Sequence, residues 1–274
     1  MNVVGLGGAG CKIAKCFEAY DQYNVVYIDH ESHGNTTVLV DKQDHPEKYE
    51  SSEIDFDEVR ALCNDVEMVF FVCGASLVSS LSLRILEHIQ DKKIHVYYVR
   101  PDISMLSSMR QANEKVVFNV LQQFARSGKF DRITLLDNQM IEELLGDMPV
   151  IGFWDKINEV ISYSVHMLNV FHNNTPVWGG LEQPNISNRI SSFGMKDMST
   201  MEENMFFSLD GEKELCYIYA VNRERLEEAN DLLKKIREDL KSRLTDNLNI
   251  SFGIFPTDYD RDVGYVLKHT SIVQ

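Results

Sequence analysis

The chain opens with Asn2-Val3-Val4-Gly5-Leu6-Gly7-Gly8-Ala9-Gly10-Cys11-Lys12, in which two β-branched residues precede four closely spaced glycines. The apolar pair predicts a buried parallel strand, and the glycines predict its turn into a helix. Gly5, Gly7 and Gly10 fit the pattern G-x-G-x-x-G, whose missing side chains let backbone N–H groups approach a phosphate at the start of the helix. Glycines in this pattern also serve tight strand–helix turns that bind nothing, so packing remains the alternative.

An acidic residue ends the next predicted strand. Residues 24–29 form a second apolar run that stops at Asp29, about 20 positions after Gly10. In dinucleotide-binding folds a carboxylate at this place holds the ribose hydroxyls. Asp29 or Glu31 would take that role here, and either acid equally well caps the end of a strand.

Length and composition indicate a globular protein with one large core or two modest ones. Of the 274 residues, 44% are hydrophobic and 25% are charged, which is typical of folded domains rather than disordered chains. The net charge of -15 argues against a nucleic-acid partner, because phosphate neutralisation needs clustered Lys and Arg. An acidic surface suits an assembly whose contacts respond to salt or divalent cations.

Cysteine usage and hydropathy point to the cytoplasm. The five cysteines include no C-x-x-C pair, which favours a reducing compartment and no structural zinc. No apolar run approaches about 18 residues, and a strand starting at Asn2 leaves no room for a signal peptide, so we expect no direct membrane binding. His30, His33 and His45 lack the spacing of a rigid metal site, so we expect surface histidines and no metal.

Strands and helices alternate through the first half of the chain. Apolar runs predict further strands at residues 37–40, 68–73, 94–99 and 133–136, and helical spacing predicts helices at residues 11–20, 56–63, 80–90, 107–126 and 138–145, with a surface loop over 41–55. This alternation predicts a right-handed, mostly parallel sheet with helices on both sides. Ligands of such sheets bind at the carboxyl ends of the strands, where Gly74, Arg100 and Asn138 lie.

The second half predicts a smaller α+β domain. A long amphipathic helix over residues 153–171 comes first. After it the patterns predict a loop over 177–185, a short helix over 186–193 ended by Gly194, a connector over 196–204, a strand at 215–221, a charged helix over 223–244, and strands at 250–255 and 264–269. We therefore expect domains at residues 1–150 and 173–274, joined by a connecting helix over 151–172.

The order of these elements resembles the tubulin/FtsZ superfamily over nearly the whole chain. The opening glycine stretch is similar to that family's first phosphate loop, and Thr134-Leu135-Leu136-Asp137-Asn138 resembles its strand that ends in an Asn-bearing loop. The helix over residues 153–171 resembles the family's central helix, and Ile250-Ser251-Phe252-Gly253-Ile254 resembles its "N-I-x-F-G" strand. The resemblance implies an α/β fold, with a Rossmann-like GTPase-type sheet domain joined by a central helix to a small α+β domain.

The resemblance also implies a set of nucleotide-binding residues. The family's second phosphate loop, G-G-G-T-G-T-G, is here Ser76-Leu77-Val78-Ser79-Ser80-Leu81-Ser82, whose Leu77 and Val78 add Cβ atoms where backbone would approach a phosphate. Asn158 aligns with the amide that contacts guanine, although a solvated helix face is the alternative. The implied binding residues are Gly7, Gly8, Ala9, Gly10, Cys11, Asp29, Gly74, Ser76, Ser79, Ser80, Asn138 and Asn158.

Hydrolysis in this family uses two acids on the loop after the central helix. Counting back from Gly194, these positions fall on Glu182 and Asn185, with Asp197 as a substitute if a gap is allowed. An asparagine cannot accept a proton as a carboxylate does, so we expect GTP hydrolysis to be weak or lost.

The resemblance thus implies a protein that binds GTP or GDP with Mg²⁺ and assembles head to tail with copies of itself. The second loop lacks the family's glycines, and this favours an alternative: a nucleotide-independent scaffold that has kept the fold and binds no cofactor. A third alternative is a dinucleotide-dependent enzyme that uses Gly5, Gly7, Gly10 and Asp29. The ending at Gln274, directly after the last strand, fits shorter phage- or plasmid-type relatives, whose cytoplasm is that of the host cell.

Overall fold

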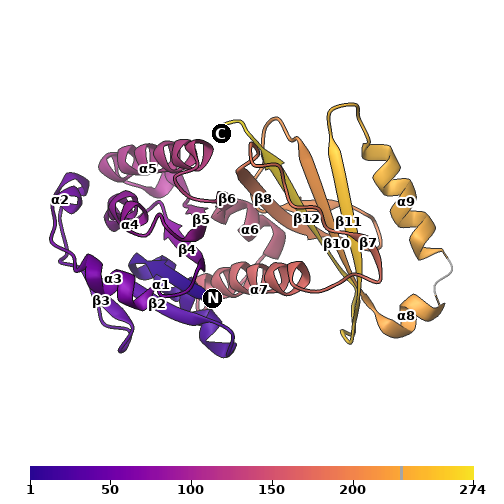
Figure 1. Cartoon of the computed structure of the whole chain (residues 1–274), viewed down its shortest axis with the longest axis horizontal. Coiled ribbons are helices and arrows are strands. Elements are labelled where there is room, and N and C mark those ends of the chain that lie inside the picture. Colours follow the sequence, from indigo (N-terminus) through magenta and orange to yellow (C-terminus); the bar gives the residue numbers. More distant parts are fainter. Residues whose placement is uncertain (229–230) are drawn as a thin grey trace. The chain divides into compact units, whose positions relative to one another are not determined.

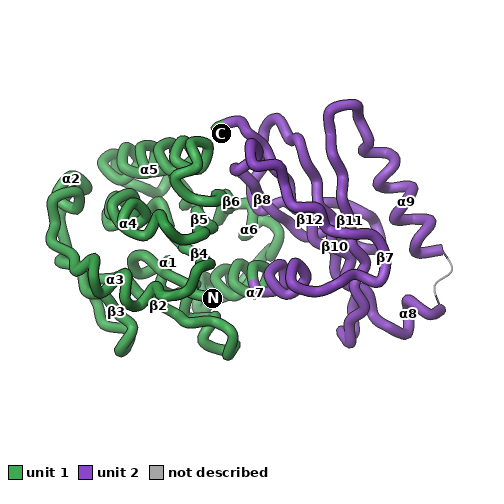
Figure 2. The backbone as a smooth tube through the Cα atoms, viewed as in Figure 1, with its two compact units in different colours: residues 1–165, 273–274 green, residues 166–272 purple. Residues whose placement is uncertain are grey.

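The computed structural model describes residues 1–228 and 231–274, which form two compact units (Figure 2). Unit 1 holds residues 1–165 and 273–274, and unit 2 holds residues 166–272. The long helix α7 (Phe153–His172) runs from unit 1 into unit 2. Within the described part of the chain, no helix combines the length and the apolar character needed to cross a bilayer.

Unit 1 is built on a parallel sheet with the strand order β3-β2-β1-β4-β5-β6 (Figure 1). Its strands are β1 (Asn2–Leu6), β2 (Asn24–Asp29), β3 (Thr37–Leu39), β4 (Glu67–Cys73), β5 (Lys93–Arg100) and β6 (Arg132–Asp137). The order of strands reverses between β1 and β4, because β2 and β3 extend to one side of β1 and β5 and β6 to the other. Parallel sheets of this type bind ligands at such a switch point, outside the carboxyl ends of the strands.

The helices of unit 1 follow the predicted alternation, with small differences at their ends. They are α1 (Gly7–Lys15), α2 (Pro46–Glu50), α3 (Phe56–Leu62), α4 (Ser82–His88), α5 (Ser108–Ser127) and α6 (Asn138–Leu145), with 3₁₀ turns η1 (Cys16–Ala19), η2 (Leu77–Leu81) and η3 (Ile103–Met105). The expected loop over 41–55 contains α2, whose Pro46 starts a helix because its missing N–H is not needed there. The helix expected over 80–90 is divided into η2 and α4.

Unit 2 is a mixed sheet with the order β8-β12-β10-β11-β7, and β9 pairs with β8. Its strands are β7 (Trp178–Gly180), β8 (Ile190–Lys196), β9 (Glu203–Met205), β10 (Glu214–Asn222), β11 (Asn249–Thr257) and β12 (Val263–Thr270). Helix α9 (Leu232–Arg243) lies along β10 and β11 (Figure 1), and its Leu232, Ile236 and Leu240 pack on Tyr217 and Tyr219.

Three predictions for unit 2 differ from the structure, and the most important concerns residues 186–193. The helix expected over residues 186–193 is instead the start of β8, because Ile190 to Phe193 are buried on both faces and pair with β12, which leaves no alternation to identify a strand. Gly194 lies inside this strand, where a Cβ atom would collide with the backbone of Asn204. The loop expected over 177–185 contains β7, and the connector over 196–204 contains the start of β9.

The charged helix expected over residues 223–244 is found in two parts, α8 (Arg223–Glu228) and α9. Residues 229–230 of that prediction lie outside the described residues.

Candidate functional site

The predicted binding residues of unit 1 come from one edge of its sheet. Because the strands are parallel, the carboxyl ends of β1, β2, β4, β5 and β6 face the same way. Asp29 and Arg100 are the last residues of β2 and β5, and the first residues after β1, β4 and β6 are Gly7, Gly74 and Asn138. The first part of α7 adds Asn158 to the same unit. This edge is therefore the candidate site.

The glycines of β1 and α1 have two different tasks. Gly5 and Gly10 allow close packing, because a Cβ on Gly5 would collide with the start of α1 and a Cβ on Gly10 would lie 2.8 Å from the Phe71 carbonyl oxygen. Gly7 has a φ of +69°, which favours glycine, and starts α1 directly after the strand. Gly8 and Ala9 are exposed, and the atom nearest to a Cβ on Gly8 is Asp29 Oδ2 at 4.0 Å.

The N-terminus of α1 lacks a side-chain cap. Its N-cap residue, Leu6, has no polar side chain and makes no capping hydrogen bond. The first N–H groups of a helix have no partner within the helix, and they carry the positive end of its dipole. With Gly8 and Ala9 exposed, this end of α1 can bind a phosphate.

The second loop is filled with its own side chains. Val78, Ser79 and Ser80 are buried in η2, and the hydroxyls of the two serines are used inside the protein. Ser79 donates to the Ser76 carbonyl oxygen at 2.7 Å, and Ser80 donates to Asn113 Oδ1 at 2.6 Å. Asn113 Nδ2 donates to Ser79 Oγ at 3.1 Å. Ser76, which is partly exposed, is the predicted serine best placed to meet a ligand.

Gly74 makes room for a buried polar cluster. A Cβ on Gly74 would collide with the Tyr98 hydroxyl, which donates to Glu114 Oε1 at 3.2 Å. Burial raises the pKa of Glu114, and the Arg100 guanidinium, with its Nε 3.6 Å from Glu114 Oε1, opposes that shift. The guanidinium also lies over the Phe118 ring. About one third of the Arg100 side chain is exposed, so it adds positive charge at this edge.

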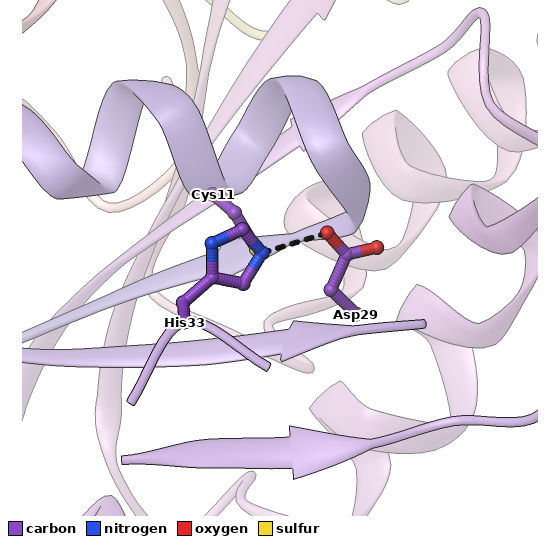
Figure 3. A group of neighbouring side chains, drawn as sticks. All are labelled: Cys11, Asp29 and His33. Atoms are coloured by element: carbon purple, nitrogen blue, oxygen red, sulfur yellow. Dashed lines mark hydrogen bonds and ion pairs between the residues drawn. The ribbon is translucent and has the colours of Figure 1, made fainter. Parts of the chain in front are cut away.

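Asp29 is buried, and protein donors occupy both of its carboxylate oxygens. The His30 N–H donates to Oδ1 at 2.8 Å, and His33 Nε2 lies 2.9 Å from Oδ2. Cys11 lies beside this pair (Figure 3), and its thiol donates to the Gly5 carbonyl oxygen at 3.2 Å. Burial raises the pKa of the Cys11 thiol to about 12. Asp29 thus anchors a small internal network at the start of α1.

The three histidines differ in their surroundings. His30 Nδ1 lies 2.9 Å from the Val40 carbonyl oxygen, and its Nε2 lies 3.0 Å from the Tyr49 hydroxyl, so both ring nitrogens have protein partners. His33 stacks on Tyr27 with 4.9 Å between ring centroids, and His45 lies near the exposed Glu47.

Two side chains on α7 and α6 suit a nucleotide base. Asn158 is only 9% exposed, yet its amide makes no side-chain hydrogen bond to any of the described residues. Asn138 is the first residue of α6, where Asp137 caps the helix by accepting the Gln139 N–H at 2.8 Å. Glu159, beside Asn158, points to Lys156 at 3.1 Å.

Sequence reasoning missed Trp154, which is 55% exposed. It lies four residues before Asn158 on α7, so the indole and the amide share one face of the helix. The combination suits a flat base with a polar edge. The spacing of four residues between Trp154 and Asn158 in a predicted helix could have indicated this from the sequence.

The predicted hydrolysis residues lie in unit 2, on the exposed loop between β7 and β8. The Asn185 N–H donates to the Glu214 carboxylate at 2.9 Å, and Asn185 Oδ1 accepts from the N–H and the hydroxyl of Ser187. Glu182 is exposed and makes no hydrogen bond to the described residues. Asp197, the substitute acid, holds a turn by accepting the Ser199 N–H at 2.6 Å, and its hydrogen bonds with Ser199 lower its pKa.

These features define a class of protein: an α/β fold with a helix N-terminus at the switch point of a parallel sheet, followed by a long helix and a mixed α+β unit. More particularly, the fold is that of the tubulin/FtsZ superfamily. The predicted resemblance and fold class are thus confirmed.

The fold comparison rests on solved structures. An empty FtsZ dimer from M. jannaschii matches with a TM-score of 0.74 and 16% identity, covering 98% of this chain and 87% of that one. A TubZ protofilament in its GTPγS form from Bacillus thuringiensis matches at 0.72 and 13%, and CetZ from Methanosaeta thermophila at 0.69 and 13%; each covers 99% of this chain and 87% of the other. Scans of protein-family models and of curated proteins found no match.

Proposed function

We propose that this chain binds a guanine nucleotide at the carboxyl edge of the unit 1 sheet and assembles head to tail with copies of itself, with GTP hydrolysis weak or lost. The observation that carries the proposal is the N-terminus of α1, which begins at Gly7 without a side-chain cap and exposes Gly8 and Ala9. A phosphate there gains hydrogen bonds from free N–H groups and a favourable interaction with the helix dipole.

The base-binding part of the proposal rests on α7. The Asn158 side chain is 9% exposed and has no hydrogen-bond partner among the described residues, so its amide is available to a ligand. The guanine edge offers both donors and acceptors to an amide. Trp154, one turn earlier, provides a surface on which the base can stack.

Self-assembly is supported by the matched structures and by exposed apolar side chains. Among the matches are an FtsZ dimer and TubZ filaments. On this chain, Val177, Trp178 and Ile186 are exposed on the loop region that carries Glu182, and Val150 and Ile151 are exposed in unit 1. These side chains are available to an interface, and a head-to-tail contact repeats without closing. A cytoplasmic location belongs to the same proposal.

Weak or absent hydrolysis follows from two local features. Asn185 stands where the resemblance implies a second acid, and its Oδ1 already accepts two hydrogen bonds from Ser187. In the second loop, the Ser79 and Ser80 hydroxyls are bound within the protein rather than free to hold phosphate or Mg²⁺.

The filled second loop also favours the alternative of a nucleotide-independent scaffold. Val78 packs against Gly7, and Asn113 holds the serines of η2. If this packing closes the phosphate site, the chain would keep its assembly surfaces and bind no nucleotide.

A titration separates the two functions. Nucleotide-stripped protein is titrated with labelled GTP, and with ATP and NAD in parallel, while assembly is followed by pelleting with and without GTP. Micromolar affinity for GTP, weaker binding of the others and GTP-dependent pelleting would support the proposal. Pelleting without affinity for any of the three would establish the scaffold instead.

A further inference from the structure

Three side chains of the types that ligate transition metals lie close together beside α1. They are Cys11 from α1, Asp29 from the end of β2, and His33 from the loop before β3. One ligand atom from each lies within 4.8 Å of the other two. Figure 3 shows the His33 ring directed at the Asp29 carboxylate, with Cys11 behind it.

Neighbouring groups fix the orientation of these side chains. Asp29 Oδ1 accepts the His30 N–H, which leaves Oδ2 facing His33. The backbone N–H of His33 donates to Thr37 Oγ1 at 2.9 Å, and the His33 ring stacks on Tyr27. Hydrogen bonds and stacking of this kind orient the ligands of metal sites.

We infer that Cys11, Asp29 and His33 form a binding site for a divalent transition-metal ion of the Zn²⁺ type. A thiolate, an imidazole and a carboxylate are the ligand types that Zn²⁺ takes, whereas Mg²⁺ and Ca²⁺ prefer oxygen ligands alone. Three protein ligands leave a fourth position for water.

The geometry needs only small movements of the side chains. Zinc bonds of about 2.0–2.3 Å hold tetrahedral ligand atoms about 3.3–3.8 Å apart. Atoms 4.8 Å apart would therefore approach by about 1–1.5 Å, whereas His33 Nε2 and Asp29 Oδ2, now 2.9 Å apart, would separate by about 0.4 Å. The ion replaces the proton between His33 Nε2 and Asp29 Oδ2 and the proton on the Cys11 thiol. Entry is possible from the His33 side, because 24% of that side chain is exposed.

This cluster differs from the group of three histidines that the sequence analysis considered and did not expect to bind metal. His30 and His45, the other histidines of that region, do not belong to it, and Cys11 and Asp29 come from separate elements that only the fold brings together. The inference does not depend on nucleotide binding.

Cobalt is the probe for this site, because thiolate–Co²⁺ bonds give a charge-transfer band in the near ultraviolet. Tag-free, metal-stripped full-length protein is titrated with Co²⁺, and the bound cobalt is then displaced with Zn²⁺. Cys16→Ser is the matched control, since Cys16 is a partly exposed cysteine at the start of η1, directly after α1, and its thiol donates to the Lys12 carbonyl oxygen. Wild type and Cys16→Ser should show the band, and Zn²⁺ should remove it.

Two variants test the ligands. Cys11→Ser should abolish the band, and His33→Gln, at a partly exposed position, should weaken Co²⁺ binding at least about tenfold. Circular dichroism of both variants, compared with wild type, is the control for folding. No band in wild type, a band that survives in Cys11→Ser, or unchanged affinity in His33→Gln would each overturn the inference.

Discussion

Val78 packs against Gly7: its Cγ1 atom lies 2.6 Å from the position that a Cβ atom on Gly7 would take. The residue that replaces a glycine in the second loop therefore lies on the first residue of α1. Because Gly7 has a positive φ and no side chain, it accommodates both the turn and this neighbour. The contact therefore requires that residue 7 has no side chain.

The glycines after β1 should separate into packing and binding positions. Gly10→Ala places a Cβ 2.8 Å from the Phe71 carbonyl oxygen, and overpacking of this kind costs about 1–3 kcal/mol of unfolding free energy. Gly8→Ala meets no atom closer than 4.0 Å and should leave stability unchanged or slightly raised. Urea unfolding of both variants measures the difference. Equal destabilisation would refute this division of tasks.

Asn158→Ala should weaken GTP binding by about three- to tenfold, the value of one hydrogen bond. It should leave the unfolding free energy unchanged, because the amide has no partner among the described residues. Glu159→Gln is the comparison, and its effect should be smaller since Glu159 is paired with Lys156. Loss of stability without loss of affinity in Asn158→Ala would assign this residue to packing.

Glu114 should make the protein less stable as the pH rises. Burial raises the pKa of its carboxyl in the folded state, so the folded chain binds this proton more tightly than the unfolded chain. The stabilisation is complete below the ordinary pKa of 4.5 and is lost as the pH rises through the folded value. Glu114→Gln should therefore gain stability relative to wild type between pH 4 and pH 7. A relative loss over this range, measured by urea unfolding, would show that Arg100 outweighs the burial.

Asn185→Asp should restore the missing acid. A carboxylate at this position can still accept the Ser187 hydrogen bonds, and a positioned base contributes about 10²–10⁴-fold to a rate. We expect phosphate release per polymer to rise at least about tenfold, and Glu182→Gln in the same background to remove the gain. An unchanged rate in Asn185→Asp would exclude this loop from hydrolysis.

The parts of the fold with strong local patterns could be predicted from the sequence. The continuous apolar run of β4 is a local signal, and the strand predicted over residues 68–73 was confirmed. The order of strand and helix around the glycines was also confirmed, but α1 begins at Gly7, four residues before the predicted start at Cys11, so the glycines belong to the helix and not to a turn before it. The prediction of a helix over residues 186–193 was wrong because Ser191 and Ser192 are buried between apolar neighbours in β8, and their burial depends on pairing with β12.

The candidate site likewise has features that the sequence predicts and features that only the folded structure shows. The glycine motif was visible, but the packing task of Gly5 and Gly10 depends on Phe71 and on the start of α1. The hydrogen bond from Ser80 to Asn113 joins residues 33 positions apart, and the Cys11–Asp29–His33 cluster joins side chains from three segments of the chain. Contacts of this kind arise only from tertiary packing.

The claim that α1 holds a nucleotide phosphate is tested most directly by the GTP affinity of Gly8→Glu beside that of Gly8→Ala. A Cβ at this position meets only Asp29 Oδ2, at 4.0 Å, so both side chains start without a collision, and a glutamate near a helix N-terminus is compatible with the helix dipole. If the phosphate binds at α1, the carboxylate excludes it: Gly8→Glu should lose at least about 30-fold in affinity, whereas Gly8→Ala should stay within about threefold of wild type. Equal affinity in the two variants would contradict the account.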